Sequence, residues 1–173
     1  KDKFSTSKIV TSLLMSGDNI IFSDDRGTIF NIYRSGKINW KKNIYKKIYK
    51  RIYKNLSFSI YNNKIYIADN IGFVYAINLN NGKLVWIKNY GIPLKSNIKI
   101  FNDKIFLVDQ NNRIICLNIK DGSKIWDILS ISSFIKSQNL LSLALSKKGD
   151  LISINSAADL FKIQANSGRI DWS

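Results

Sequence analysis

Apolar and polar positions follow a pattern that occurs four times along the chain. Each occurrence has a short apolar run, a polar turn, a second apolar run, and a glycine followed four residues later by tryptophan. The first runs are NIIFSD, KIYIAD, KIFLVD and DLISIN, and the second runs are TIFNIYR, FVYAINL, RIICLNI and DLFKIQA. A weaker apolar run precedes each set. Short runs rich in Ile, Tyr, Phe and Val are typical of β-strands, so each occurrence predicts four strands.

The apolar positions also indicate that both faces of these strands are covered. Phe73, Tyr75 and Ile77 share one face of a predicted strand, while Val74 and Ala76 lie on the other. A four-stranded sheet buries two apolar faces only when it packs between neighbouring sheets. The tryptophans follow one another at intervals of 46, 40 and 46 residues. This period predicts an all-β protein, a β-propeller with four four-stranded antiparallel blades.

Residues 1–173 are predicted to form a single, partial β-propeller domain. The predicted blades lie at about 7–43, 56–89, 96–128 and 139–173. The two longer intervals come from insertions between blades, at about 41–55 and 128–139. Such connections emerge on the rim of a propeller, where packing tolerates extra residues and binding residues collect.

The glycine and the tryptophan of each unit have different predicted roles. Glycine adopts the positive φ that a tight turn between two strands requires. Tryptophan brings about 150–250 Å² of burial to the same place in every unit. We therefore interpret the tryptophans as packing between neighbouring blades rather than as platforms for a ligand. The four pairs are Gly36 and Trp40, Gly82 and Trp86, Gly122 and Trp126, and Gly168 and Trp172.

With these residues in place, the chain resembles the PQQ-like (quinoprotein-type) repeat family. The segment VYAINLNNGKLVW matches the family pattern through Tyr75, Ala76, Gly82 and Trp86. Asn78 stands where the family usually has aspartate, as does Asn118, and Gln164 takes that place in the last unit. The resemblance extends from about residue 7 to the end of the chain. It implies a propeller in which each tryptophan docks against the adjacent blade, and a closed ring of seven or eight blades.

The family has an enzymatic and a non-enzymatic branch, and the composition favours the second. The dehydrogenases of the family bind pyrroloquinoline quinone and calcium, with a vicinal cysteine pair and glutamate at the site. This chain has one cysteine, Cys116, and no glutamate. The resemblance is therefore to the BamB-type branch, which has no cofactor and serves outer-membrane β-barrel assembly. It implies a non-enzymatic scaffold at the periplasmic face of the outer membrane, with the assembly machinery as protein partner; the alternative is a fragment of a PQQ-dependent dehydrogenase.

The titratable residues limit the chemistry that the chain can perform. It contains no histidine, so neither a Ser-His-Asp arrangement nor a Cys-His arrangement can form. A zinc site would lack both imidazoles and a thiolate set. Cys116 lies in an apolar run and is interpreted as core. We expect most aspartates to accept hydrogen bonds from nearby backbone amides in turns. We assign no catalytic, cofactor-binding or metal-binding residue.

A net charge of +15 suggests acidic partners, although an AT-rich genome would also enrich lysine. The charge is dense in the first insertion, WKKNIYKKIYKRIYKN, where Ile-Tyr pairs recur every four residues. That period fits isoleucines along one helical face, and it also fits a long twisted hairpin. The segment is either a solvated loop whose isoleucines fold back on the blade, a protein-binding site, or a site for nucleic acid or anionic lipid. The candidate partner-binding residues are Tyr45, Lys46, Tyr49, Arg51 and Tyr53.

The second insertion, ILSISSFIKSQNL, carries little charge. Phe134 and Ile135 form an aromatic-aliphatic tip that is either a protein contact or a plug for its own propeller. Four blades would also leave apolar faces at both ends of the array. We expect a processed or trimmed piece of a longer propeller that is able to self-associate; a dimer of half-propellers and a tight four-blade ring are the alternatives.

Overall fold

The computed structural model describes residues 10–130 and 136–173, which form four separate four-stranded antiparallel sheets. The first sheet contains β1 (Val10–Ser16), β2 (Asn19–Asp24), β3 (Thr28–Tyr33) and β4 (Ile38–Asn43). The second contains β5 (Leu56–Tyr61), β6 (Lys64–Asp69), β7 (Phe73–Asn78) and β8 (Leu84–Asn89).

The third sheet contains β9 (Lys99–Phe101), β10 (Lys104–Val108), β11 (Arg113–Asn118) and β12 (Lys124–Leu129). The fourth contains β13 (Ser142–Leu145), β14 (Asp150–Ile154), β15 (Leu160–Gln164) and β16 (Ile170–Trp172). Among residues 10–130 and 136–173, the helical element is a single 3₁₀ turn, η1 (Lys47–Tyr49). No helix in the described residues is both long enough and apolar enough to cross a membrane.

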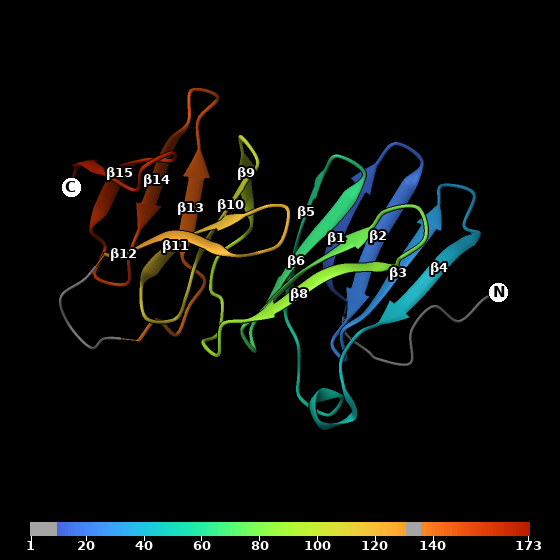
Figure 1. Ribbon diagram of the computed structural model, residues 1–173. Helices are drawn as coiled ribbons and strands as arrows, with labels where there is room; N and C mark the ends of the chain where they lie inside the picture. Colours follow the sequence, from blue (N-terminus) through green and yellow to red (C-terminus); the bar gives the residue numbers. More distant parts are fainter. Residues whose placement is uncertain (1–9, 131–135) are drawn as a thin grey trace.

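Each sheet is an up-and-down meander in which consecutive strands pair. β1 lies beside β5, β5 beside β9, and β9 beside β13, so the first strands line one side of the array and the fourth strands form the opposite edges. Figure 1 shows the sheets following one another, with the first and the last at opposite ends. The predicted all-β architecture of four four-stranded antiparallel blades is confirmed.

Local sequence explains why the strands turn where they do. Asn62 and Asn63 both have positive φ and form the two-residue turn between β5 and β6, a conformation that Asn tolerates well. At the end of β6, the Asp69 side chain accepts hydrogen bonds from three backbone amides, those of residues 71–73. Asp24, Asp109 and Asn155 close the equivalent turns through their own side-chain oxygens. The prediction that aspartates satisfy turn amides is confirmed at these three aspartate positions.

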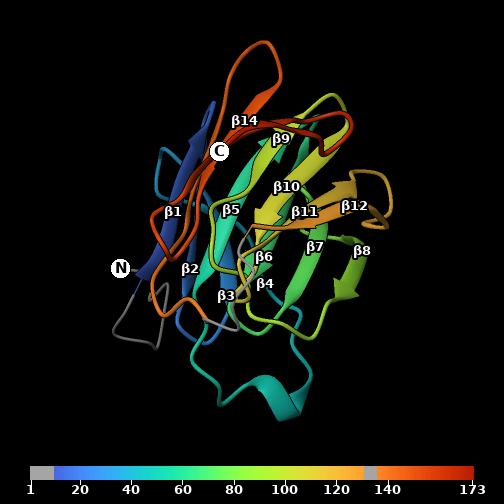
Figure 2. The ribbon, with the colours of Figure 1, turned by 90° about the vertical axis from the view of Figure 1, so that its left-hand side faces the viewer.

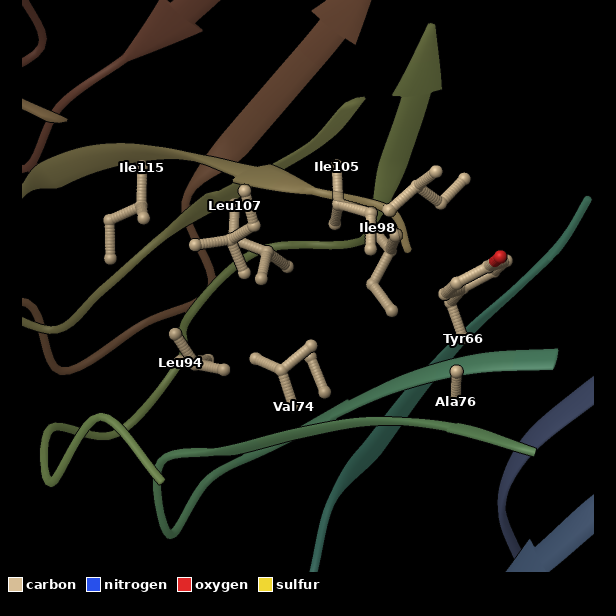
Figure 3. Packing of buried hydrophobic residues seen from close by; sticks show 11 residues of the cluster. Tyr66, Val74, Ala76, Leu94, Ile98, Ile105, Leu107 and Ile115 are labelled. Atoms are coloured by element: carbon tan, nitrogen blue, oxygen red, sulfur yellow. The ribbon is translucent and has the colours of Figure 1, made fainter. Parts of the chain in front are cut away.

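The core consists of three apolar layers, one between each pair of neighbouring sheets. Between the second and third sheets, Val74 and Ala76 face Ile105 and Leu107, and all four are fully buried (Figure 3). Alternation along the strands sends odd and even residues into different layers, so each inner sheet contributes to two layers. Burying one such aliphatic side chain contributes about 1.5–3 kcal/mol, which makes these layers the main source of stability.

Candidate partner-binding surface

Each of the first three tryptophans contacts the glycine turn of the following sheet. The indole nitrogen of Trp40 donates a hydrogen bond to the Leu79 carbonyl at 2.9 Å. A Cβ placed on Gly82 would lie 2.8 Å from the Trp40 ring, so only glycine leaves room for the indole. The same arrangement joins Trp86 to the Ile119 carbonyl and Gly122, and Trp126 to the Ala165 carbonyl and Gly168. These residues connect the sheets and are not available for partner binding.

The two ends of the array lack this contact within the described residues. Gly36 has φ +84°, and a Cβ on it would meet no atom within 4 Å. Trp172, on the outer strand of the fourth sheet, is 47% exposed. The cross-strand neighbour of Trp172 is Lys162, whose ammonium pairs with Asp150 at 3.2 Å. The end face therefore carries charge at a position that is apolar in the second and third sheets.

The first insertion is a compact loop between β4 and β5 that projects beyond the strands (Figures 1 and 2). The sequence allowed a continuous helix or a long hairpin, and the insertion adopts neither. Between β4 and β5 it contains one 3₁₀ turn, η1, and no strand. The isoleucines fold back on the blade only in part: Ile44 packs against the core between the first two sheets, whereas Ile48 is 75% exposed and Ile52 is 45% exposed. Tyrosine and lysine side chains provide the other anchors of the loop.

Tyr45 anchors the first half of the insertion and is only 6% exposed. Its hydroxyl donates a hydrogen bond to Oδ2 of Asp69 at 2.5 Å and lies 3.4 Å from the hydroxyl of Tyr75. Burial is the main cause that raises the pKa of Tyr45, and burial likewise raises the pKa of Asp69. Tyr45 was expected among the partner-binding residues, but a side chain enclosed in this way has no contact surface left. We therefore remove it from the candidate surface.

Lys54 anchors the second half of the insertion, and its side chain has no exposed area. The ammonium donates hydrogen bonds to the carbonyls of Tyr49 at 2.6 Å and Ile52 at 2.8 Å, and it lies 4.6 Å from the centre of the Tyr45 ring. Burial lowers the pKa of Lys54, and the carboxylate of Asp69 opposes that shift. The sequence pattern gave no reason to single out this lysine among the seven basic residues of the segment.

Gly27 explains how both anchors reach the first sheet. It has φ +78°, and a Cβ there would lie 2.4 Å from the Tyr45 ring and 2.5 Å from Cδ of Lys54. Any side chain at this position would therefore displace the insertion. Tyr45 and Lys54, near the two ends of the insertion, therefore both pack over the turn after β2.

The remaining predicted residues of the insertion differ in exposure. Lys46, Arg51 and Tyr53 are exposed, whereas Tyr49 is half-buried and packs edge-on against Phe73 with ring centres 5.2 Å apart. The structure thus brings Lys46, Arg51 and Tyr53 to one projecting loop. Phe134 and Ile135, which were predicted in the second insertion, lie outside the described residues.

A groove that the sequence did not single out lies between the insertion and β8. It has a volume of about 630 Å³, and Ile44, Ile48, Phe73, Leu84 and Ile87 form most of its apolar wall. Leu84 and Ile87 are 45% and 39% exposed. The signal in the sequence was the outer strand LVWIKN, which has apolar residues on both sides of its tryptophan.

Charge is distributed unevenly around this groove. Residues 26–102 contain fifteen lysines and arginines but a single acidic residue, Asp69, which is buried. Residues 103–173 contain nine basic residues and seven aspartates, so their charges nearly balance. In residues 10–130 and 136–173, no three His, Cys, Asp or Glu side chains are grouped so that they could hold a metal ion. Residues 10–89, which hold the first two sheets and the insertion, carry thirteen basic residues against four aspartates, whereas residues 90–173 carry eleven against seven, so positive charge is denser on the first two sheets.

Four meandering sheets connected by repeated tryptophan contacts define the class of protein, a β-propeller built from PQQ-like repeats. A family model described as outer membrane protein assembly factor BamB matches residues 31–173, and the chain belongs to that family. A comparison with curated protein sequences finds no match.

Solved structures with the same fold have little sequence identity to this chain. BamB from Moraxella catarrhalis superposes with a TM-score of 0.72 at 14% identity, covering 95% of this chain and 52% of that one. The computationally designed Ika8 protein has a TM-score of 0.74 at 12% identity, covering 93% and 47%. The computationally designed Ika4 protein has a TM-score of 0.73 at 12% identity, covering 92% of both chains. The chain thus spans about half the length of BamB and Ika8.

Proposed function

We propose that this chain is a non-catalytic protein-binding scaffold of the BamB type, which helps outer-membrane β-barrel proteins to assemble at the periplasmic face of that membrane. Membership in the BamB family supports this role. The observation that carries the proposal is the anchored insertion, which holds Lys46, Arg51 and Tyr53 exposed on a loop of defined shape. A preorganised loop loses little conformational entropy on binding and is therefore suited to recognise a protein.

A pull-down with the soluble domains of the outer-membrane assembly machinery tests the proposal. The informative variant is Lys46→Ser, Arg51→Ser and Tyr53→Ser combined, because it leaves the anchors Tyr45 and Lys54 in place. We expect the parent chain to retain these domains and the variant to lose most of them. A control variant with Lys120, Lys147 and Lys148 changed to Ser removes exposed charge from the third and fourth sheets, and it should bind like the parent. Equal capture by all three chains, or none by the parent, contradicts the proposal.

Binding of nucleic acid or anionic lipid is the second candidate function, favoured by the fifteen basic residues against one buried aspartate in residues 26–102. Such binding would be electrostatic, so its affinity would fall steeply as salt rises. Titration with a fluorescent oligonucleotide and with phosphatidylglycerol vesicles at two salt concentrations measures it. An undetectable or salt-independent interaction rejects this candidate and leaves the scaffold role.

A further inference from the structure

The outer strand β8 has one charged residue, Lys88, whereas the outer strands of the sheets on either side have two each. β8 ends its sheet, and in the described part of the chain no other strand pairs with its second edge. Proteins usually protect such an edge with charged side chains, because its free amides and carbonyls are able to pair with another chain. On β4, Lys41 and Lys42 directly follow the tryptophan. On β12, Lys124 and Asp127 flank it and form an ion pair.

β8 has apolar residues at the two positions where β12 has that ion pair. Leu84 corresponds to Lys124 and Ile87 to Asp127, since both pairs have the same spacing from the tryptophan. Leu84 and Ile87 are partly exposed and form part of the groove wall next to the insertion. The opposite wall includes Ile48, which is the most exposed large apolar residue of the described chain. A free strand edge and an apolar groove therefore lie side by side.

The surroundings of the groove indicate the chemistry of its partner. Lys46 lines it, and the neighbouring residues Lys47 and Lys88 are exposed. No acidic side chain near it in sequence is free to balance them, because Asp69 is buried and bonded to Tyr45. Single-stranded nucleic acid binds by stacking bases on open aromatic faces, but the rings of Tyr49 and Phe73 in this groove pack edge-on against each other. The groove instead fits apolar side chains with negative charges beside them.

We propose that the edge of β8 and this groove bind an extended peptide segment of a partner protein in which apolar residues alternate with acidic ones. The segment adds a fifth strand to the second sheet through backbone hydrogen bonds. Its apolar side chains enter the groove between Ile48 and Ile87. Its acidic side chains point to the opposite face of the added strand, on the side of β8 that carries Lys88. This inference rests on the proposed protein-binding function and specifies the site and the kind of segment.

The test uses two synthetic peptides that differ only in charge, one alternating Val and Asp and the other alternating Val and Lys. Fluorescence anisotropy measures their binding to the full chain at low and high salt, and amide chemical shifts locate the site. We expect the Asp peptide to bind, more weakly at high salt, with shifts concentrated on residues 84–89. We expect no binding of the Lys peptide.

The decisive variant gives β8 the charges found on β12, through Leu84→Lys and Ile87→Asp combined. We expect it to bind the Asp peptide at least about tenfold more weakly. The matched control, Leu160→Lys with Ile154→Asp, makes the same replacements at exposed apolar residues of the fourth sheet and should bind like the parent. Circular dichroism melting verifies that both variants fold.

The outcomes separate this inference from the proposed function. Equal binding of both peptides, equal binding by parent and β8 variant, or amide shifts that leave out residues 84–89 overturn the inference. If the β8 variant still retains the assembly domains in the pull-down, the inference fails and the scaffold role stands. If the parent binds the Asp peptide at β8 but captures no assembly domain, the peptide site stands and the role in outer-membrane assembly fails.

Discussion

Trp40, Trp86 and Trp126 lie between sheets, whereas Trp172 lies on the outward face of the fourth sheet. Each of the first three donates its indole hydrogen to a carbonyl of the next sheet and covers a glycine there. Trp172 has the same place in its own repeat but is 47% exposed. The comparison shows that each repeat supplies only one side of a contact between sheets, the tryptophan. The neighbouring sheet supplies the other half, namely the carbonyl and the glycine.

The residues opposite Trp86, Trp126 and Trp172 reflect this difference, whereas Trp40 is paired with the buried Asn31, whose amide donates a hydrogen bond to the Leu79 carbonyl. Ala76 is paired with Trp86 and Cys116 with Trp126, and both are completely buried. Lys162 is paired with Trp172 and forms ion pairs with Asp150 and Asp171. A charged group at this position would be costly inside a layer between sheets, because burial removes its hydration. The interior and end faces thus differ in chemistry as well as in exposure.

The largest expected effect comes from removing an interior indole. Trp86→Ala should lower the free energy of unfolding by about 3–5 kcal/mol, since it empties space between the second and third sheets. Trp172→Ala should cost no more than about 1 kcal/mol, because its indole is half exposed and packs against no other sheet of the described residues. Urea denaturation followed by far-ultraviolet circular dichroism measures both. Equal losses would show that the tryptophans do not connect the sheets as described.

The glycine side of the contact should give an intermediate effect. Gly36→Ala and Gly122→Ala both place a Cβ at positive φ, which costs about 1 kcal/mol from backbone strain alone. Gly122→Ala also forces that Cβ to within 2.7 Å of the Trp86 ring, adding about 1–3 kcal/mol. The same denaturation experiment compares the two variants. If Gly36→Ala is as destabilising as Gly122→Ala, contact with the indole is not the reason for glycine.

The smallest expected effect is a difference in pH dependence between an interior and an end-face acid. Burial raises the pKa of Asp69 above its ordinary value of 3.8, so its contribution to stability is present below that value and is lost as pH rises through the raised pKa. The hydrogen bond from Lys162 is the main cause that lowers the pKa of Asp150. Its contribution is present above the ordinary value and is lost as pH falls through the lowered pKa.

Asn replacements isolate these two contributions. Relative to Asp69→Asn, the parent chain should lose stability as pH rises from about 4. Relative to Asp150→Asn, the parent chain should gain stability as pH rises through the acidic range. Denaturant midpoints between pH 3 and 7 provide the comparison, and slopes of the same sign would contradict it.

The blades were predictable because their signal is local. Alternation of apolar residues, the Asn62–Asn63 turn and the spacing from Gly82 to Trp86 all act within one repeat. Short-range steric preferences and one periodic pattern specify these strands before any long-range contact forms. The family resemblance had the same basis, and the match over residues 31–173 confirms it.

The insertion was predictable in position but not in conformation. Its four-residue period suggested isoleucines on a buried face, yet Ile48 and Ile52 are exposed while Tyr45 and Lys54 are buried. The period does not reveal that Gly27, which lacks a side chain, leaves room for Tyr45 and Lys54. It also does not reveal that the Asp69 carboxylate on the second sheet accepts a hydrogen bond from Tyr45. Those two features decide which side chains turn inward.

The sequence by itself determined the repeat, the strands, the glycine turns and the position of every tryptophan, because these follow from periodicity and backbone sterics within about 45 residues. Only the tertiary structure decided which tryptophans pack against a following sheet, which lysine of the insertion is enclosed, and that β8 borders an apolar groove. Each of these depends on atoms from a neighbouring sheet. Burial and pKa are properties of the assembled surroundings rather than of the residue.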